Sequence, residues 1–407
     1  GVFEYGTQYY TYEEGVGYTL ADVSVGGTIS STYFVNQKVV SYTQAVAYSS
    51  ETTYYQKDRS TVEYKGEIGD YAFSQCTALT TATIEAQILG DYMFNYCTAL
   101  EKVYLVNANI KKINKAAFYH CEKLTIITND KTDAVTDYIA LEKTSITEIG
   151  DYAFNYCLEL KEVALPDTLT KVGSYAFAYN EELLEATISC GDATFGTYVF
   201  AFDTKLTTVT IAAGVKAIPD YAFYNCSSLV SMILEGDLDA QNDIVKIPTN
   251  VQSIGTYAFA NCDSIINLEI PALLTTIGDY AFANCEELVN VDVKGAYLGK
   301  YMFANCYALE RVDIAEAAYI DAVLTKITEI PEGAFYRCFS LVSLNDTNVI
   351  KLNESITAIG EKAFAQSTAL TTLKLPSTLL SIAEGAFSGT RSMTTIDIPF
   401  IGGARTS

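Results

Sequence analysis

The sequence predicts an α/β solenoid, in which one short strand from each coil joins a parallel sheet. A segment from Ile149 to Leu160 recurs in variants until the chain ends. Its phenylalanine occurs thirteen times, at intervals of about 23 residues with four longer ones, and a fixed period of this length is typical of a solenoid. The thirteen are Phe73, Phe94, Phe118, Phe154, Phe177, Phe200, Phe223, Phe259, Phe282, Phe303, Phe335, Phe364 and Phe387.

Length and charge agree with one long solenoid and limit its partners. A solenoid adds core linearly, so 407 residues fit a single domain. The net charge of −23 repels phosphate backbones and anionic lipids, which argues against nucleic acid and membrane surfaces. The chain begins at Gly1 and shows neither a signal-peptide core nor a membrane-spanning apolar run, which predicts a processed or trimmed soluble product.

Residues 1–62 lack the motif and are predicted to form a β-rich cap over the first coil. Gly26 and Gly27 separate two β-prone runs, a pattern typical of a hairpin. An independent adhesive module is the alternative for this region. The predicted strands are 18–25, 28–35, 39–48 and 52–55. Residues 63–399 are predicted to form the thirteen repeats, and residues 400–407 a tail.

Each coil divides into three parts, which the copy around Phe154 illustrates. Val163 and Leu165 stand two residues apart and predict a strand with one buried face, which Pro166 ends because proline donates no backbone hydrogen bond. A second short apolar piece follows. The Gly-Asp-Tyr-Ala-Phe segment is predicted to form one helical or 3₁₀ turn with its aspartate as N-cap.

The glycine of that segment is predicted to reflect tight packing or turn geometry. Pro219 and Pro331 replace it in two copies, and proline fixes φ near about −65°, so the position does not require a positive φ. The four longer intervals hold extra residues that are predicted to lie in loops or bulged turns at a coil edge. These insertions are 128–145, 235–249, 315–326 and 346–353.

Nine of the ten cysteines stand three residues after the motif phenylalanine, and they predict a ladder of buried, free thiols. Small side chains that form hydrogen bonds are what the turn backbone of each coil needs. A disulfide ladder is disfavoured because four copies have no cysteine there. The nine are Cys76, Cys97, Cys121, Cys157, Cys226, Cys262, Cys285, Cys306 and Cys338.

Catalysis and metal binding find little support in the residue types. The single histidine, His120, is predicted to be a surface turn residue, and no Cys-x-x-Cys motif accompanies it. One histidine leaves little room for a Ser-His or Cys-His pair. We therefore expect no enzyme activity, no cofactor and no metal site.

The residue two before the motif phenylalanine is tyrosine in nine copies, and these rings are predicted to stack from coil to coil. A half-buried packing ladder is the favoured interpretation, and an aromatic strip for a sugar or peptide is the alternative. The candidate stripe is Tyr152, Tyr175, Tyr198, Tyr221, Tyr257, Tyr280 and Tyr301.

A second candidate ligand surface lies on the predicted sheet, where alternate residues of three consecutive strands point outward. Three carboxylates then fall on neighbouring strands and oppose folding unless a cation, Arg311 or a basic partner offsets them. A solvated acidic face is the simple interpretation, and docking of a basic segment or of Ca²⁺ is the functional one. The outward residues are Asn267, Glu269, Asn290, Asp292, Arg311 and Asp313.

Residues 68–398 resemble the BspA-like leucine-rich repeat family, with the best matches at 149–166, 254–271 and 359–376. The shared unit is Leu-x-x-Leu-x-Leu-Pro-x-x-Leu-x-x-Ile-Gly-x-x-Ala-Phe-x-x-Cys. The resemblance implies a right-handed superhelix and a secreted or cell-surface protein that adheres to host matrix or to other cells. Attachment to a surface is implied only by this analogy.

We therefore expect a noncatalytic, acidic and tyrosine-rich binding module, outside the cell or on its surface, whose partner is an extracellular protein. A glycan is a further candidate partner. The alternative function is a self-assembling subunit of an extracellular filament or surface layer, because unpaired edge strands favour self-association. Asn345-Asp346-Thr347 and Asn353-Glu354-Ser355 also fit glycosylation sequons in an insertion.

Overall fold

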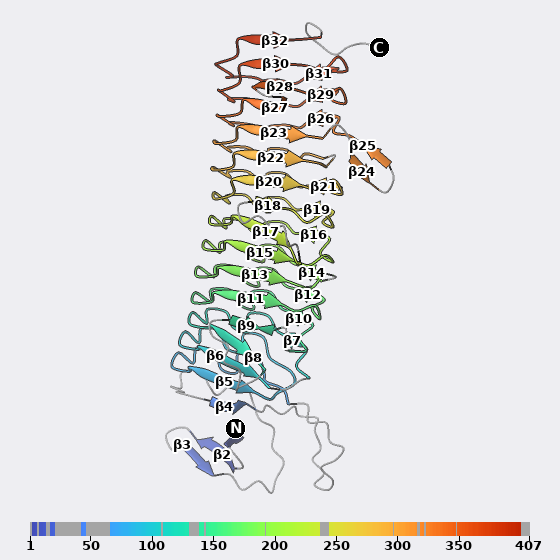
Figure 1. Cartoon of the computed structure of the whole chain (residues 1–407). Helices are drawn as coiled ribbons and strands as arrows, with labels where there is room; N and C mark the ends of the chain where they lie inside the picture. Colours follow the sequence, from blue (N-terminus) through green and yellow to red (C-terminus); the bar gives the residue numbers. More distant parts are fainter. Residues whose placement is uncertain are drawn as a thin grey trace. The chain divides into compact units, whose positions relative to one another are not determined.

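The computed structural model describes residues 2–5, 8–13, 17–20, 42–45, 66–106, 109–129, 138–141, 144–191, 193–236, 244–295, 297–315, 318–320, 323–346 and 348–399. The chain divides into two compact units, Gly1–Glu182 and Leu183–Ser407. Each unit contains a parallel β-solenoid, which confirms the predicted fold class (Figure 1).

The main sheet of the first unit takes one strand from each coil, in the order β4-β5-β6-β8-β9-β11, and all pairs are parallel. These strands are β4 (Tyr42–Ala45), β5 (Thr81–Ile84), β6 (Lys102–Leu105), β8 (Ile126–Thr128), β9 (Tyr138–Ala140) and β11 (Glu162–Leu165). A narrow second sheet joins β7 (Lys112–Ile113), β10 (Glu148–Ile149) and β12 (Lys171–Val172).

The region predicted as a cap contains β1 (Val2–Tyr5), β2 (Gln8–Glu13) and β3 (Gly17–Leu20), which form an antiparallel sheet. The predicted hairpin at Gly26 and the predicted strand 52–55 lie outside the described residues. β4 lies within the predicted strand 39–48, but it pairs in parallel with β5 of the solenoid. This strand therefore belongs to the main sheet.

The main sheet of the second unit has the order β13-β15-β17-β18-β20-β22-β23-β27-β28-β30-β32, and only β27 and β28 pair antiparallel. Its strands are β13 (Glu185–Ile188), β15 (Thr208–Ile211), β17 (Ser231–Leu234), β18 (Ile244–Lys246), β20 (Asn267–Ile270), β22 (Asn290–Val293), β23 (Arg311–Ile314), β27 (Ser343–Asp346), β28 (Val349–Lys351), β30 (Thr372–Lys374) and β32 (Thr395–Asp397).

Shorter strands lie elsewhere on the coils of the second unit. β16 (Ala217–Ile218), β19 (Ser253–Ile254) and β21 (Thr276–Ile277) form one parallel sheet. β26 (Glu329–Ile330), β29 (Ala358–Ile359) and β31 (Ser381–Ile382) form another. β14 spans Thr194–Phe195, and β24 (Ala318–Ile320) forms an antiparallel hairpin with β25 (Val323–Thr325).

Three of the four insertions add a strand to a main sheet. The prediction of edge loops was wrong for these strands, because β9, β18 and β28 each pair with neighbouring strands of the main sheet. Pairing satisfies backbone groups that an irregular loop would leave to water. The insertion 315–326 instead contains the hairpin of β24 and β25.

The predicted helical turn is a run of tight turns that bond to the next coil. Tyr280 and Asn284 have φ values of 59° and 60°. Their N–H groups donate to carbonyl oxygens of the following coil, and so does that of Phe282, at 2.8–3.0 Å. Asp279 is not an N-cap, because its Oδ1 accepts the N–H of Lys300 in the next coil at 3.1 Å. A helix would use these N–H groups within its own segment.

The stack itself explains the recurrent glycine, as predicted. A Cβ on Gly278 would lie 2.3 Å from the backbone nitrogen of Thr256 in the neighbouring coil. Real Cβ contacts are never that short, so coil spacing rather than φ selects glycine here.

Two ladders of side chains in the interior run from coil to coil, within a core that also contains many Leu, Ile and Val side chains. Phe282 is fully buried and stacks between Phe259 and Phe303, with ring centroids 5.0 and 6.0 Å away. Beside this ladder, the Cys285 thiol donates to the carbonyl oxygen of Phe259 at 3.3 Å. All ten cysteines are free and buried, which confirms the predicted thiol ladder. Burial raises the pKa of the Cys262 thiol well above its ordinary value.

Candidate functional site

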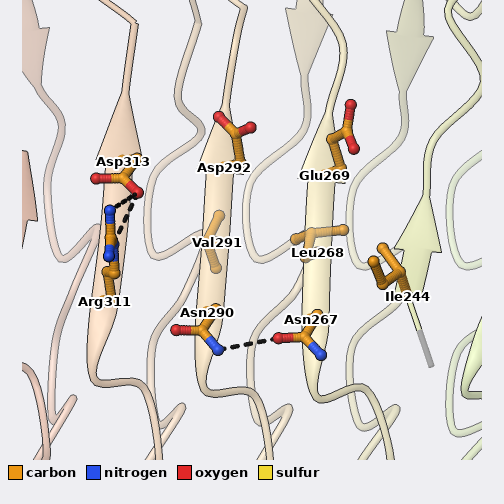
Figure 2. A pocket seen from close by; sticks show the side chains of 9 residues that line it. All are labelled: Ile244, Asn267, Leu268, Glu269, Asn290, Val291, Asp292, Arg311 and Asp313. Atoms are coloured by element: carbon orange, nitrogen blue, oxygen red, sulfur yellow. Dashed lines mark hydrogen bonds and ion pairs between the residues drawn. The ribbon is translucent and has the colours of Figure 1, made fainter. Parts of the chain in front are cut away.

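The six predicted face residues lie on one side of three adjacent strands (Figure 2). Asn267, Asn290 and Arg311 stand in register across β20, β22 and β23, and the three carboxylates form a second row. Between the two rows, Leu268 and Val291 are 2% exposed. The two-residue period of a strand therefore sends the apolar side chains into the core and the polar ones outward.

These residues line a shallow hollow with a volume of about 340 Å³ that is open to solvent. Ile244 of β18 lies at one end of the hollow, and Arg311 and Asp313 of β23 at the other (Figure 2). The hollow is thus confined to four neighbouring strands of the second unit.

The first row contains the side-chain amides of Asn267 and Asn290 and the guanidinium of Arg311. The Asn290 Nδ2 group donates to Asn267 Oδ1 at 2.9 Å, so the two amides are oriented by each other. Arg311 turns along its own strand, and its Nε and Nη2 both lie 2.8 Å from Asp313 Oδ2. Arg311 therefore neutralises the carboxylate on its own strand.

The second row contains a cation that the sequence argument missed. Lys294 Nζ contacts Glu269 Oε1 and lies 3.4 Å from Asp292 Oδ2, so it bridges two strands. The hydrogen bond to Glu269 raises the pKa of Lys294 above its ordinary value. Lys294 stands two residues after Asp292. Because outward positions on a strand recur every two residues, extending the pattern by one position would have identified it.

Lys294 and Arg311 provide the offset that the sequence argument required for the three carboxylates. Glu269, Asp292 and Asp313 each have Lys294 or Arg311 as a partner, so their mutual repulsion is largely offset within the protein. Over the described ranges, no group of three histidine, cysteine, aspartate or glutamate side chains is placed to hold a metal ion. The face therefore presents amides and ion pairs.

The tyrosine stripe forms a stacked ladder. In the second unit, the ring of Tyr257 lies 5.1 Å from Tyr221 and 4.7 Å from Tyr280, with interplanar angles of 10° and 1°. The ladder continues to Tyr198 and Tyr301 at 4.2 and 5.0 Å. In the first unit, Tyr152 stacks on Tyr175 at 4.9 Å.

The tyrosine rings pack on a row of small residues. Ala260, Ala283 and Ala304 are at most 3% exposed, and the partly buried rings of Tyr257 and Tyr280 pack against them. Both faces of these inner rings contact other rings, so neither face is free to stack on a sugar. The geometry favours a packing ladder over a binding strip.

A second stacked ladder in the first unit was not predicted. His120 lies between Tyr96 and Tyr156, with centroid distances of 4.7 and 4.3 Å, and Tyr156 stacks on Tyr179 at 4.6 Å. His120 is a turn residue, as predicted, and its partly exposed ring is also part of an aromatic ladder. These side chains share the position two after the motif phenylalanine, which is the signal that a repeat alignment would have shown.

The two sequon asparagines hold the last insertion in place. Asn345 Oδ1 accepts the N–H of Ile314 at 2.6 Å, and its Nδ2 donates to Asn353 Oδ1 at 3.0 Å. Asn353 Nδ2 donates in turn to the carbonyl oxygen of Ile314 at 3.1 Å. Both amides are engaged in structural bonds, which argues against glycosylation.

Nowhere in the described part of the chain is there a helix long and apolar enough to span a bilayer.

Comparison with known proteins identifies the repeat. The model of the BspA type leucine rich repeat region matches residues 59–139, 130–243, 239–348 and 328–401. A leucine-rich repeat protein from Bacteroides ovatus is 26% identical, with a TM-score of 0.64 over 83% of this chain and 79% of that chain.

A leucine rich cell surface protein from Faecalibacterium prausnitzii is 20% identical over 98% of this chain and 94% of that chain, with a TM-score of 0.41. No curated protein is significantly similar to the chain.

Proposed function

Because the chain belongs to the BspA-type leucine-rich repeat family, we propose that it is a noncatalytic binding module for an extracellular protein, secreted or displayed at a cell surface. Adhesion to a matrix protein or to another cell is the biological role that this proposal implies. The proposed contact surface is the polar face of β20, β22 and β23 with its hollow.

The observation that carries the proposal is the composition of this face. Coil stacking sets the positions of Asn267, Asn290 and Arg311, because each occupies the same register on neighbouring strands. Rigid placement lowers the conformational cost of binding. Amides and paired charges present both hydrogen-bond donors and hydrogen-bond acceptors to a protein partner.

Charge and surface chemistry support a partner outside the cell. The net charge of −23 disfavours nucleic acid and anionic membranes, and the chain contains 31 tyrosines, a residue type that suits protein recognition. The buried thiols have no disulfide partners, so the stack is held by coil packing and needs no oxidising compartment to form.

A pair of matched substitutions tests this proposal. Asn290→Arg adds bulk and charge to the hollow, whereas Thr276→Arg makes the same kind of change on an exposed residue of β21 in the same unit. Binding to a panel of immobilised matrix proteins and glycans is measured for both. We expect Asn290→Arg to weaken binding at least about tenfold and Thr276→Arg to leave it unchanged. Equal binding by the two variants would assign the partner to another surface.

A further inference from the structure

One turn of the second unit carries an arginine that lies against two aromatic rings. The Cζ atom of Arg337 is 5.8 Å from the centroid of the Tyr307 ring and 5.4 Å from that of the Phe339 ring. The two rings stack on each other at 5.1 Å, with an interplanar angle of 7°. Attraction between a guanidinium and aromatic rings fixes the position of the cation. The charge of Arg337 is therefore held in one place on the surface.

Arg337 forms no ion pair among the described residues. Lys294 and Arg311 of the same unit each contact carboxylates, and the chain contains 49 acidic against 26 basic residues. The Nε atom of Arg337 is also buried without a hydrogen-bond partner. Arginine binds carboxylates strongly, through parallel hydrogen bonds. An arginine without an acidic partner in so acidic a chain is thus suited to a carboxylate from outside the fold.

Carboxylates without a basic partner lie in the neighbouring turns. Glu286 and Glu287 are exposed and Asp263 is half-buried, and none of them forms an ion pair within the described ranges. The N–H of Glu287 donates to the carbonyl oxygen of Asp263, and that of Ala308 to the carbonyl oxygen of Glu286, both at 3.2 Å. Burial raises the pKa of Asp263, and the two glutamates raise it further. These acidic turns therefore stack directly before the turn of Tyr307.

The opposite charges are arranged symmetrically about Tyr307. Glu286, Tyr307 and Phe339 each stand four residues after the motif phenylalanine of consecutive coils, so they form one column along the stack. The guanidinium of Arg337 lies beside this column, because it contacts both rings. Coils repeat at about 4.8 Å. Glu286 and Arg337 thus lie one coil before and one coil after Tyr307.

We propose that two copies of the chain associate through this column, antiparallel, with a two-fold axis at Tyr307. In a two-fold contact, a residue that faces a second residue of the partner is itself faced in the same way. Arg337 of one copy then faces Glu286 of the other, twice, and the two Tyr307 rings meet at the axis. An acidic segment of another protein would pair with Arg337 but would leave Glu286 and Glu287 without a partner. Charge complementarity within the column therefore favours a second copy.

The overall charge makes this dimer a weak one. The net charge of −23 on each copy opposes association. At about 0.15 M salt, charges more than about 8 Å apart are largely screened, whereas contacting pairs are less affected. The contact consists of turn residues and excludes the outward side chains of β20, β22 and β23. It is therefore independent of the proposed ligand face, and Asn290→Arg should leave it unchanged.

Sedimentation velocity of the 407-residue chain tests the proposal, from about 5 to about 200 µM, where weak interfaces dissociate. We expect a concentration-dependent equilibrium between monomer and dimer. Arg337→Glu and Glu286→Arg each place like charges opposite one another, so each should weaken the dimer at least about tenfold. Their combination restores a pair of reversed sign and should recover the dimer. Lys216→Glu, at an exposed lysine just before β16, is the matched control and should have no effect.

A cross-link tests the position of the axis. Ala308→Cys places a thiol beside Tyr307, and mild oxidation should join two copies there, because the native thiols are buried. Thr204→Cys, in a turn four coils away, should not cross-link. A chain that stays monomeric at every concentration would overturn the proposal and assign Arg337 to a different acidic partner. A dimer that is unaffected by both single charge reversals, or a folded double variant that stays monomeric, would also overturn it.

Discussion

Lys294, at the end of one strand of the polar face, bridges Glu269 of the preceding strand and Asp292 of its own. This contact offsets the repulsion between carboxylates on neighbouring strands. It also changes the expected behaviour of substitutions on the face.

Replacing Lys294 should therefore restore the repulsion. We expect Lys294→Met to lower the free energy of unfolding by less than about 1 kcal/mol, because the ammonium is 46% exposed and water screens the pair. The folded-state pKa of Lys294 is raised, so its contribution is present at neutral pH and is lost as pH rises above about 10.5.

Urea unfolding at pH 7 and pH 11 measures both effects. Asp292→Asn in the Lys294→Met background should recover part of the loss, whereas Asp292→Asn alone should not stabilise the protein. A clear gain from Asp292→Asn alone would show that Lys294 does not offset the carboxylates.

The phenylalanine ladder predicts a gradient of stability along the coils. Phe282 is fully buried between two other rings, whereas Phe387 is half-buried and, among the described residues, stacks only on Phe364, at 5.2 Å. We expect Phe282→Ala to cost about 3–5 kcal/mol and Phe387→Ala clearly less. Thermal and urea unfolding of the two variants compare them directly. Equal losses would contradict the stacked core.

The thiol ladder predicts that cysteine chemistry is blocked by burial. In native protein a thiol reagent should label few cysteines, because burial disfavours the reactive thiolate. After denaturation without reductant, all ten should react. Fewer than ten would reveal disulfides and refute the ladder.

The thiol of Cys285 also has a structural role that substitutions can separate. Cys285→Ser should keep the bond to the Phe259 carbonyl oxygen, as Ser367 does to Phe335 at 3.0 Å. Cys285→Val should leave that oxygen unpaired and cost about 1–3 kcal/mol. If valine proved as stable as serine in thermal unfolding, the thiol bond would contribute nothing.

His120 predicts an acid-dependent loss of stability in the first unit. Its stacking between Tyr96 and Tyr156 desolvates the imidazole, and this burial lowers its pKa despite Glu122 nearby at 3.8 Å. The unfolded chain then binds a proton more readily. The contribution of His120 to the stability of the fold is therefore present above the unfolded pKa of about 6.5. It is lost as the pH falls through the folded-state pKa.

His120→Tyr removes this titration while it preserves the aromatic ladder. Melting temperatures at pH 7.5 and pH 5.5 should fall less in the variant than in the native chain. A pH dependence that is identical in both proteins would exclude His120 as its source.

The sequence by itself determined the repeat, the two interior ladders and the sides on which Asn267 and Leu268 lie. These features recur with the period, and a strand's alternation follows from backbone geometry. The structure decided the rest, because the decisive partners lie in another coil. The turn N–H groups donate to the next coil instead of forming a helix. Lys294 contacts Glu269 on the neighbouring strand, and β18 pairs with β20 as an additional strand of the main sheet. Such contacts join residues far apart in the chain, and an insertion shifts their spacing, so only the stacked coils bring them together.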